Sequence, residues 1–188
     1  MSETILAISL GVGLAAACGF RVFVPLFALS LAALSGHVEL HDSFAWVGTL
    51  PALVAFGVAT FLEIGAYYFP LVDNLLDSVA SPAAVVAGVV ATASCVTDMS
   101  PLMQWSVAII AGGGAAGVVQ LVTVKARLAT AAFTGGTLNP VVSTLENVGA
   151  IFLSVLGVLL PALALVLAVV AVFLLWRWSR RRQAAAAA

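Results

Sequence analysis

Charged residues are scarce in this chain. Only 8% of its 188 residues are Asp, Glu, Lys or Arg, whereas 63% are hydrophobic. A soluble domain usually carries about 25% charged residues, because water must solvate its outside. The composition therefore excludes a soluble globular domain and predicts an integral membrane protein. One domain is expected over 1–183, with residues 184–188 as a disordered alanine tail.

Cysteine and histidine are also rare, with two of each. Cys18 and Cys95 both lie in apolar segments, where a thiol behaves as a small hydrophobic group, so no disulfide framework is expected. The start MSETILAISLG has no basic region, and its apolar run is too long for a signal peptide, so none is predicted. No nucleophile–base pair, cofactor motif or nucleic-acid-binding pattern is visible. We therefore expect neither an enzyme nor a cofactor.

Long apolar runs fill most of the chain. A helix needs about 20 mostly apolar residues to cross a bilayer. A break is expected near Gly19 to Pro25, which leaves open whether 4–33 is one kinked helix or a re-entrant pair. The last apolar run would be about 57 Å long as a single helix, so it is divided near Gly157 to Pro161. The sequence thus predicts an all-α polytopic bundle with six spans: 4–33, 48–69, 82–97, 102–126, 140–157 and 158–177.

Basic residues predict an orientation for these spans. Lys and Arg favour the cytoplasmic side of a membrane. Lys125 and Arg127 end the fourth span, and four arginines lie between 177 and 182. Six spans place both groups inside together with the N-terminus, and leave 36–47 and 98–101 outside. Five spans would put Lys125 and Arg127 outside.

Two stretches in different halves are alike. TFLEIGAYY in the second span and STLENVGAI in the fifth both place a glutamate shortly before Gly-Ala. With three spans in each half, 102–177 would run in the opposite sense to 4–97, as in the inverted repeats of many secondary transporters. A chance match of two short stretches is the alternative.

Three charged residues fall inside predicted spans: Glu63, Glu146 and Arg21. Charges within a bilayer cost at least about 2.5 kcal/mol each, so they usually face the inside of a bundle and often mark function. One interpretation is a shared polar site, in which two carboxylates bind a cation or a proton and Arg21 supplies a counter-charge. The other is that Glu–Arg pairs only hold helices together.

Further polar residues lie near the predicted span ends. Asp73 and Asp77 share a helix face on the cytoplasmic side, either as a solvated turn or at the mouth of a pathway. Asp98 either caps the next helix or lies at the outer mouth. Asn139 begins a helix whose amide groups could bind a substrate, or it caps that helix.

Two other patterns are interpreted without a ligand. The spacing of His37 and His41 could suit a metal, but we interpret their loop as solvated and predict no metal site. The stretch AGGGAAG (111–117) lacks the Lys-Ser/Thr ending of a phosphate loop. Small residues at a helix–helix contact explain it better.

The longer motifs resemble those of a known family. AACGFRVFVPLF, FLEIGAYYFPLVDNLLD, VTDMSP and TGGTLNPVVST resemble a bacterial family of integral membrane proteins known as domain of unknown function 4126, over roughly residues 5–175. The resemblance implies a multi-pass protein of the bacterial inner membrane. It supplies no substrate and no functional residue.

Two functions are therefore expected as alternatives. The first is a small homo-oligomeric transporter or channel for a cation or a proton-coupled solute. Its site would be built on Glu63 and Glu146, with Arg21 and Asn139 nearby and Asp73, Asp77 and Asp98 near the mouths. The second is a membrane scaffold without transport, whose buried charges are structural. Membrane lipids are the partners that both share.

Overall fold

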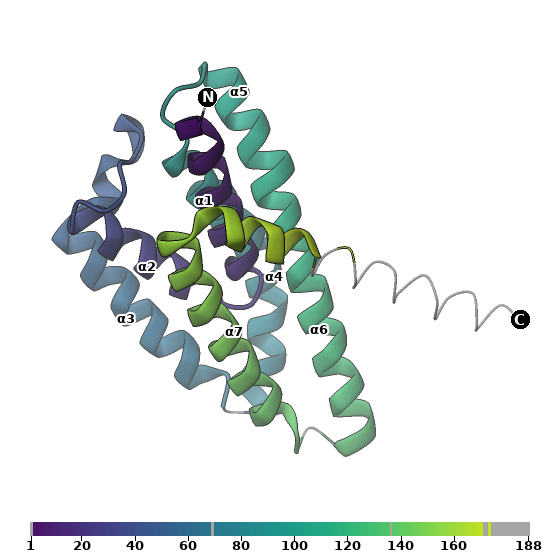
Figure 1. The fold of residues 1–188 in the computed structure, drawn as a ribbon. Coiled ribbons are helices and arrows are strands. Elements are labelled where there is room, and N and C mark those ends of the chain that lie inside the picture. Colours follow the sequence, from purple (N-terminus) through teal and green to yellow (C-terminus); the bar gives the residue numbers. More distant parts are fainter. Residues whose placement is uncertain (1, 69, 136, 171–172, 174–188) are drawn as a thin grey trace, which may run out of the picture.

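The described part of the chain is helical. The computed structural model describes residues 2–68, 70–135, 137–170 and 173, with the backbone alone at residue 2 and over 70–77, and those residues contain no strand. The predicted all-α class is thus confirmed for them. The helices in Figure 1 are α1 (Ser2–Cys18), α2 (Phe23–Leu34), the 3-10 helix η1 (Asp42–Gly48), α3 (Leu50–Ala66), α4 (Pro70–Cys95), α5 (Pro101–Val107), the π-helix η2 (Ala108–Gly113), α6 (Gly114–Thr134) and α7 (Asn139–Leu159). A short helix over Pro161–Val170 follows α7.

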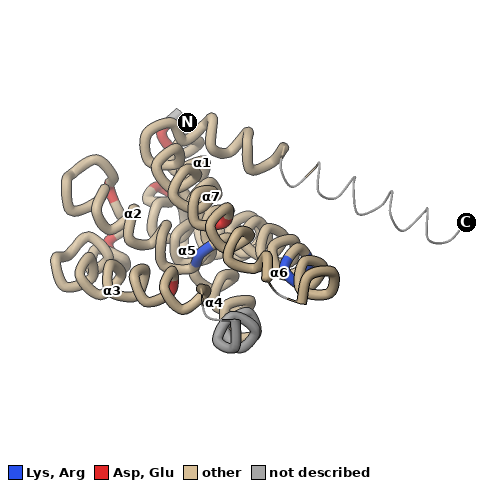
Figure 2. The backbone as a smooth tube through the Cα atoms, turned by 90° about the horizontal axis from the view of Figure 1, so that it is seen from below, with Lys and Arg blue, Asp and Glu red and all other residues tan. Residues whose placement is uncertain are grey.

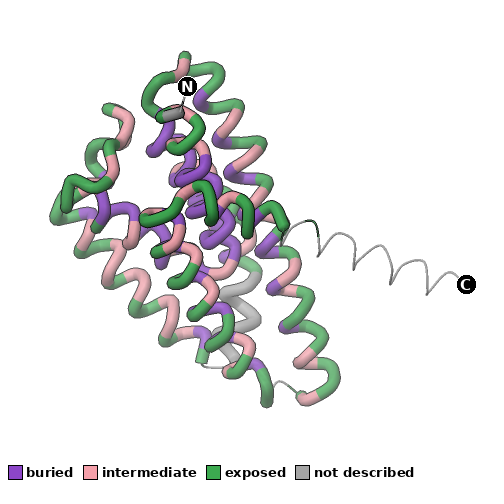
Figure 3. The backbone as a smooth tube through the Cα atoms, viewed as in Figure 1, coloured by how far each residue is buried: buried purple, intermediate pink, exposed green. Residues whose placement is uncertain are grey.

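Several of these helices are suited to a bilayer. Three segments are long and apolar enough to cross it: Ser78–Cys95, Pro101–Thr134 and Asn139–Leu159. A fourth span results if η1 and α3, which meet at a bend of 63°, are counted together. Large apolar side chains cover the outside, as lipid contact requires, and the buried positions lie between the helices (Figure 3). The chain is thus built as a membrane protein, while the predicted number of six spans is not confirmed.

Both predicted breaks are present. α1 ends at Cys18 and α2 begins at Phe23, so the first apolar segment is interrupted inside the expected range. α7 ends at Leu159, and at Leu160 the backbone leaves the helical region with φ −139° and ψ 69°. Pro161 then starts the next helix, because a proline has no N–H to continue the preceding hydrogen-bond ladder.

The start of α1 and the end of α2 lie at the same end of the bundle. α1 runs antiparallel to α4, with Gly11 against Thr92 and Ala15 against Gly88. After α2, the His41 N–H donates to the Ser94 carbonyl over 2.8 Å, so the chain has returned to the end where α4 finishes. The pair is therefore a hairpin rather than one kinked span. Its N-terminus lies at this end (Figure 1), whereas the predicted topology placed it on the side of Lys125 and Arg127.

The predicted inverted repeat is not confirmed either. The Gln104 amide of α5 donates to the carbonyls of Ala93 and Val96 over 2.8 and 3.2 Å. α5 thus begins at the same end as α1, and both run away from it. An inverted repeat would require the first elements of the two halves to run in opposite senses. α3 and α7, which carry the two glutamates, do run oppositely to each other (Figure 1).

Small residues let α1, α4 and the α5–α6 segment approach closely. A Cβ atom added to Gly112 would lie 2.7 Å from the Gly88 carbonyl oxygen and 2.8 Å from the Thr92 Cβ. Buried alanines such as Ala15, Ala84 and Ala116 fill the rest of this contact. The interpretation of 111–117 as a helix–helix contact agrees with this packing.

Candidate functional site

A charged cluster lies where α1 and α2 are interrupted. It comprises Arg21 in the interruption, Glu63 of α3, Arg127 of α6 and Glu146 of α7. Figure 2 shows a basic position near the centre of the bundle and others on α6, with acidic positions on α7 and α3 and further ones at the periphery. We call these four residues the charged cluster. It draws together segments that are more than 100 residues apart, because Arg21 bonds to residues of α7.

Arg21 fastens the tip of the α1–α2 hairpin to α7. Its side chain is fully buried, with the residue only 1% exposed. Its Nε donates to Asn147 Oδ1 over 2.5 Å, its Nη2 to the Ser143 carbonyl over 3.2 Å, and its Nη1 to the Phe20 carbonyl over 3.3 Å. Nη1 also lies 3.2 Å from Glu146 Oε2. Every nitrogen of the guanidinium thus has a partner, as a buried charge requires.

Arg127 binds the same carboxylate, that of Glu146, as Arg21 does. Its Nε donates to Glu146 Oε1 over 3.0 Å and its Nη2 to Oε2, the two-bond geometry in which Arg holds a carboxylate most firmly. The guanidinium carbons of Arg21 and Arg127 lie 3.9 and 4.1 Å from the ring centroid of Tyr67, which adds a cation–π contact to each. Glu146 is thus neutralised by two cations and is 4% exposed.

Glu63 has a different role, because its partners are backbone amides. Its Oε1 accepts from the Val22 N–H over 2.8 Å and its Oε2 from the Phe23 N–H over 3.0 Å. These amides are free donors at the start of α2, whose own N-cap residue makes no side-chain bond. An anion is stabilised at a helix N-terminus by such donors and by the helix dipole. Glu63 is half-buried, so it is the more accessible of the two glutamates.

The two glutamates therefore do not form the single site predicted from the sequence. Glu146 binds arginines, and Glu63 binds a helix terminus. They are joined indirectly, because Arg21 of one group and Val22 of the other are consecutive residues. A displacement of the hairpin tip would change the surroundings of both carboxylates.

The remaining predicted site residues either lie outside the charged cluster or have side chains that the structure does not describe. Asn139 is the first residue of α7 and does not cap it; its Oδ1 accepts from the Thr130 hydroxyl over 3.2 Å. Asp98 is exposed in the turn before α5, where no side chain bonds the helix start. The side chains of Asp73 and Asp77 lie outside the described residues.

Sequence reasoning missed four members of this region. Arg127 was assigned to topology, while Tyr67, Ser143 and Asn147 were not singled out as site residues. A signal existed for the last two, since Ser143 lies three residues before Glu146 and four before Asn147, and so shares a helix face with each of them. Small polar residues around a buried charge are the groups that solvate it in place of water.

Nothing in the described residues forms a metal centre. No three His, Cys, Asp or Glu side chains among them are grouped as metal ligands. His37 bonds the Ser35 hydroxyl over 2.9 Å, and His41 Nδ1 accepts from the Ser43 N–H at the start of η1. Both rings thus serve the local structure of the 35–48 loop.

Two grooves on the surface of the described residues are not lined by any residue of the charged cluster. The larger, about 720 Å³, lies between α1, α6 and the helix after α7. The smaller, about 240 Å³, lies between α2, the following turn and the end of α7. The charged cluster is therefore charge-balanced and closed in this structure, with Glu63 as its most accessible carboxylate.

Comparison with known proteins gives a family and no activity. No curated protein and no solved structure matches this chain. A family model described as Domain of unknown function (DUF4126) matches residues 8–181. Since that match covers nearly the whole chain, the protein belongs to the DUF4126 family.

Proposed function

We propose that this protein is a small transporter of the bacterial inner membrane for a cation or a proton-coupled solute, captured here in a closed arrangement. The observation that carries the proposal is the interrupted α1–α2 hairpin, whose free helix N-terminus is occupied by the Glu63 carboxylate. Helices broken inside the membrane, with helix ends aimed at charged groups, are how many secondary transporters build their sites.

In this proposal the two glutamates have separate tasks. Glu63 is the group that takes up a proton or a cation, because it is half-buried and held by amides rather than by a fixed counter-charge. Glu146 keeps the bundle closed through Arg21 and Arg127. When Glu63 is neutralised, its bonds to Val22 and Phe23 weaken, and the hairpin tip can leave α7.

Proton flux into proteoliposomes tests the proposal. With a pH-sensitive dye trapped inside, the wild-type protein is expected to dissipate a pH gradient faster than empty vesicles. Glu63→Gln, which keeps the shape of the side chain but cannot carry the charge, is expected to reduce the flux to the level of empty vesicles. Glu39→Gln is the matched control, because Glu39 is exposed in the 35–41 turn. Absence of wild-type flux, or full flux in Glu63→Gln, would contradict the proposal.

A second candidate is favoured by a specific observation. Every described polar group of Arg21 and the carboxylate of Glu146 is already satisfied inside the bundle, which is what a purely structural network requires. The protein would then be a membrane scaffold that acts through its outer surface. In that case Glu63→Gln would alter stability alone, and vesicles with the wild-type protein would hold their pH gradient.

A further inference from the structure

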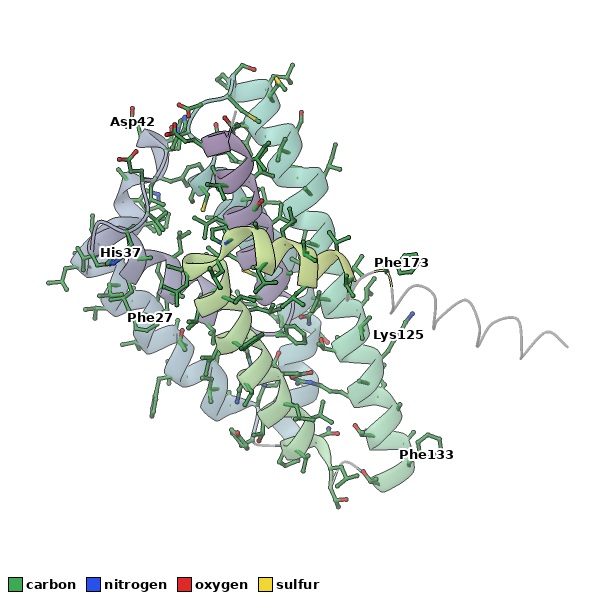
Figure 4. All side chains as sticks on the ribbon, in the orientation of Figure 1. Phe27, His37, Asp42, Lys125, Phe133 and Phe173 are labelled. Carbon is green, nitrogen blue, oxygen red and sulfur yellow. The ribbon has the colours of Figure 1, made fainter. Side chains whose placement is uncertain are left out.

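The larger groove is lined by apolar side chains throughout. It lies where the helix after α7 crosses α1 and the continuous η2–α6 segment (Figure 4). Gly114 leaves it open, because a Cβ atom added there would meet nothing within 4 Å. A polar ligand would find no hydrogen-bond partner in such a lining. The lining residues are Ile8, Val12, Ala111, Gly114, Ala115, Val118, Leu165, Ala168, Val169 and Phe173.

A basic side chain lies beyond one end of this groove. Lys125 follows Val118 by seven residues, so both lie on one face of α6, about 10 Å apart along its axis. Figure 4 shows Lys125 and Phe173 projecting on the same side of the molecule. Lys125 is exposed and makes no ion pair with a carboxylate among the described residues. Its long stem can carry the ammonium along the surface toward a membrane interface.

We propose that this groove and Lys125 form a binding site for an anionic phospholipid. One acyl chain would lie in the groove, and the phosphate group would bind the Lys125 ammonium. A helix of a second copy of the chain could also fill an apolar groove, but it would leave Lys125 without a counter-charge. An anionic lipid would fill the apolar groove and also supply a counter-charge to Lys125, because anionic lipids attract basic residues near a membrane surface.

The test is native mass spectrometry in detergent, with phosphatidylglycerol and phosphatidylcholine of identical acyl chains added in turn. The wild-type protein is expected to bind phosphatidylglycerol about fivefold more tightly. Lys125→Gln is expected to remove that preference while binding to phosphatidylcholine persists. Ala115→Leu, which fills the groove, is expected to weaken both lipids by the same factor. Ala55→Leu, at an exposed position of α3, is the matched control and should bind both lipids normally.

Three outcomes would overturn the proposal. Equal wild-type binding of the two lipids would show that the site does not recognise the negative charge of the headgroup. Unchanged binding in Ala115→Leu would show that the acyl chain lies elsewhere. A wild-type dimer that becomes a monomer in Ala115→Leu would assign the groove to a second copy of the chain.

Discussion

Replacing Glu146 with glutamine is expected to lower the free energy of unfolding by about 3–5 kcal/mol, the usual cost of breaking a buried ion pair. The change removes the one anion that Arg21 and Arg127 share. Arg21 would keep Asn147 and the Ser143 carbonyl, but two like charges would remain close together in a buried region. Unfolding of the purified protein in detergent, followed by circular dichroism, measures the loss.

A second substitution separates charge imbalance from a general defect in packing. In the double variant Glu146→Gln/Arg127→Gln, one cation leaves together with the anion. We expect the double variant to be more stable than the sum of the two single losses predicts, by about 1–3 kcal/mol, as for other residues in one network. Glu39→Gln, at an exposed position, should unfold as the wild type does. Additive losses would show that the network is not coupled.

Replacing Gly112 with alanine is expected to destabilise the bundle, because overfilling a packed contact usually costs about 1–3 kcal/mol. The new Cβ would lie 2.7 Å from the Gly88 carbonyl oxygen. That neighbour is backbone, so α4 and η2 would have to move apart. Alanine favours a helix over glycine by about 1 kcal/mol, which is too little to reverse the sign. The midpoint of thermal unfolding in detergent reports the change.

Gly114→Ala is the matched control for Gly112→Ala. It adds the same atom two residues further along the same continuous helix, where nothing lies within 4 Å. It is expected to leave the midpoint unchanged or to raise it. If both variants unfold alike, the close approach of α4 and η2 does not limit stability.

The helices themselves could be predicted because apolar runs and prolines act locally. The interruption near Arg21 and the division at Pro161 followed from Gly and Pro chemistry alone. The path of the chain could not be predicted in the same way. The 4–33 segment is long enough to cross a bilayer, and only its contacts with α4 show that it turns back.

Three residues of the charged cluster could be predicted from the sequence, but the partners that they bind could not. The rarity of charge pointed to Glu63, Glu146 and Arg21, since a charge inside an apolar segment needs a reason. The choice of partner is a tertiary property: Glu63 reaches the start of α2, and Glu146 reaches a basic residue that topology had already explained. The Gly-Ala that follows each glutamate suggested that Glu63 and Glu146 are equivalent, whereas their surroundings in the fold differ.

The most direct test of transport is whether the closed charged cluster ever opens. Ser143 is fully buried: its hydroxyl donates to the Tyr67 carbonyl, and its own carbonyl accepts from Arg21. A cysteine at this position therefore becomes accessible only when the hairpin tip or the end of α3 leaves α7. In a chain with Cys18→Ala and Cys95→Ala, the measurement is the reaction of Ser143→Cys with a membrane-impermeant maleimide in vesicles. Our account predicts steady labelling of the folded protein, and faster labelling at the same pH when Glu63→Gln is added, because that substitution neutralises the carboxylate that holds the hairpin tip. Labelling that occurs only after denaturation would contradict it and leave the charges with a structural role.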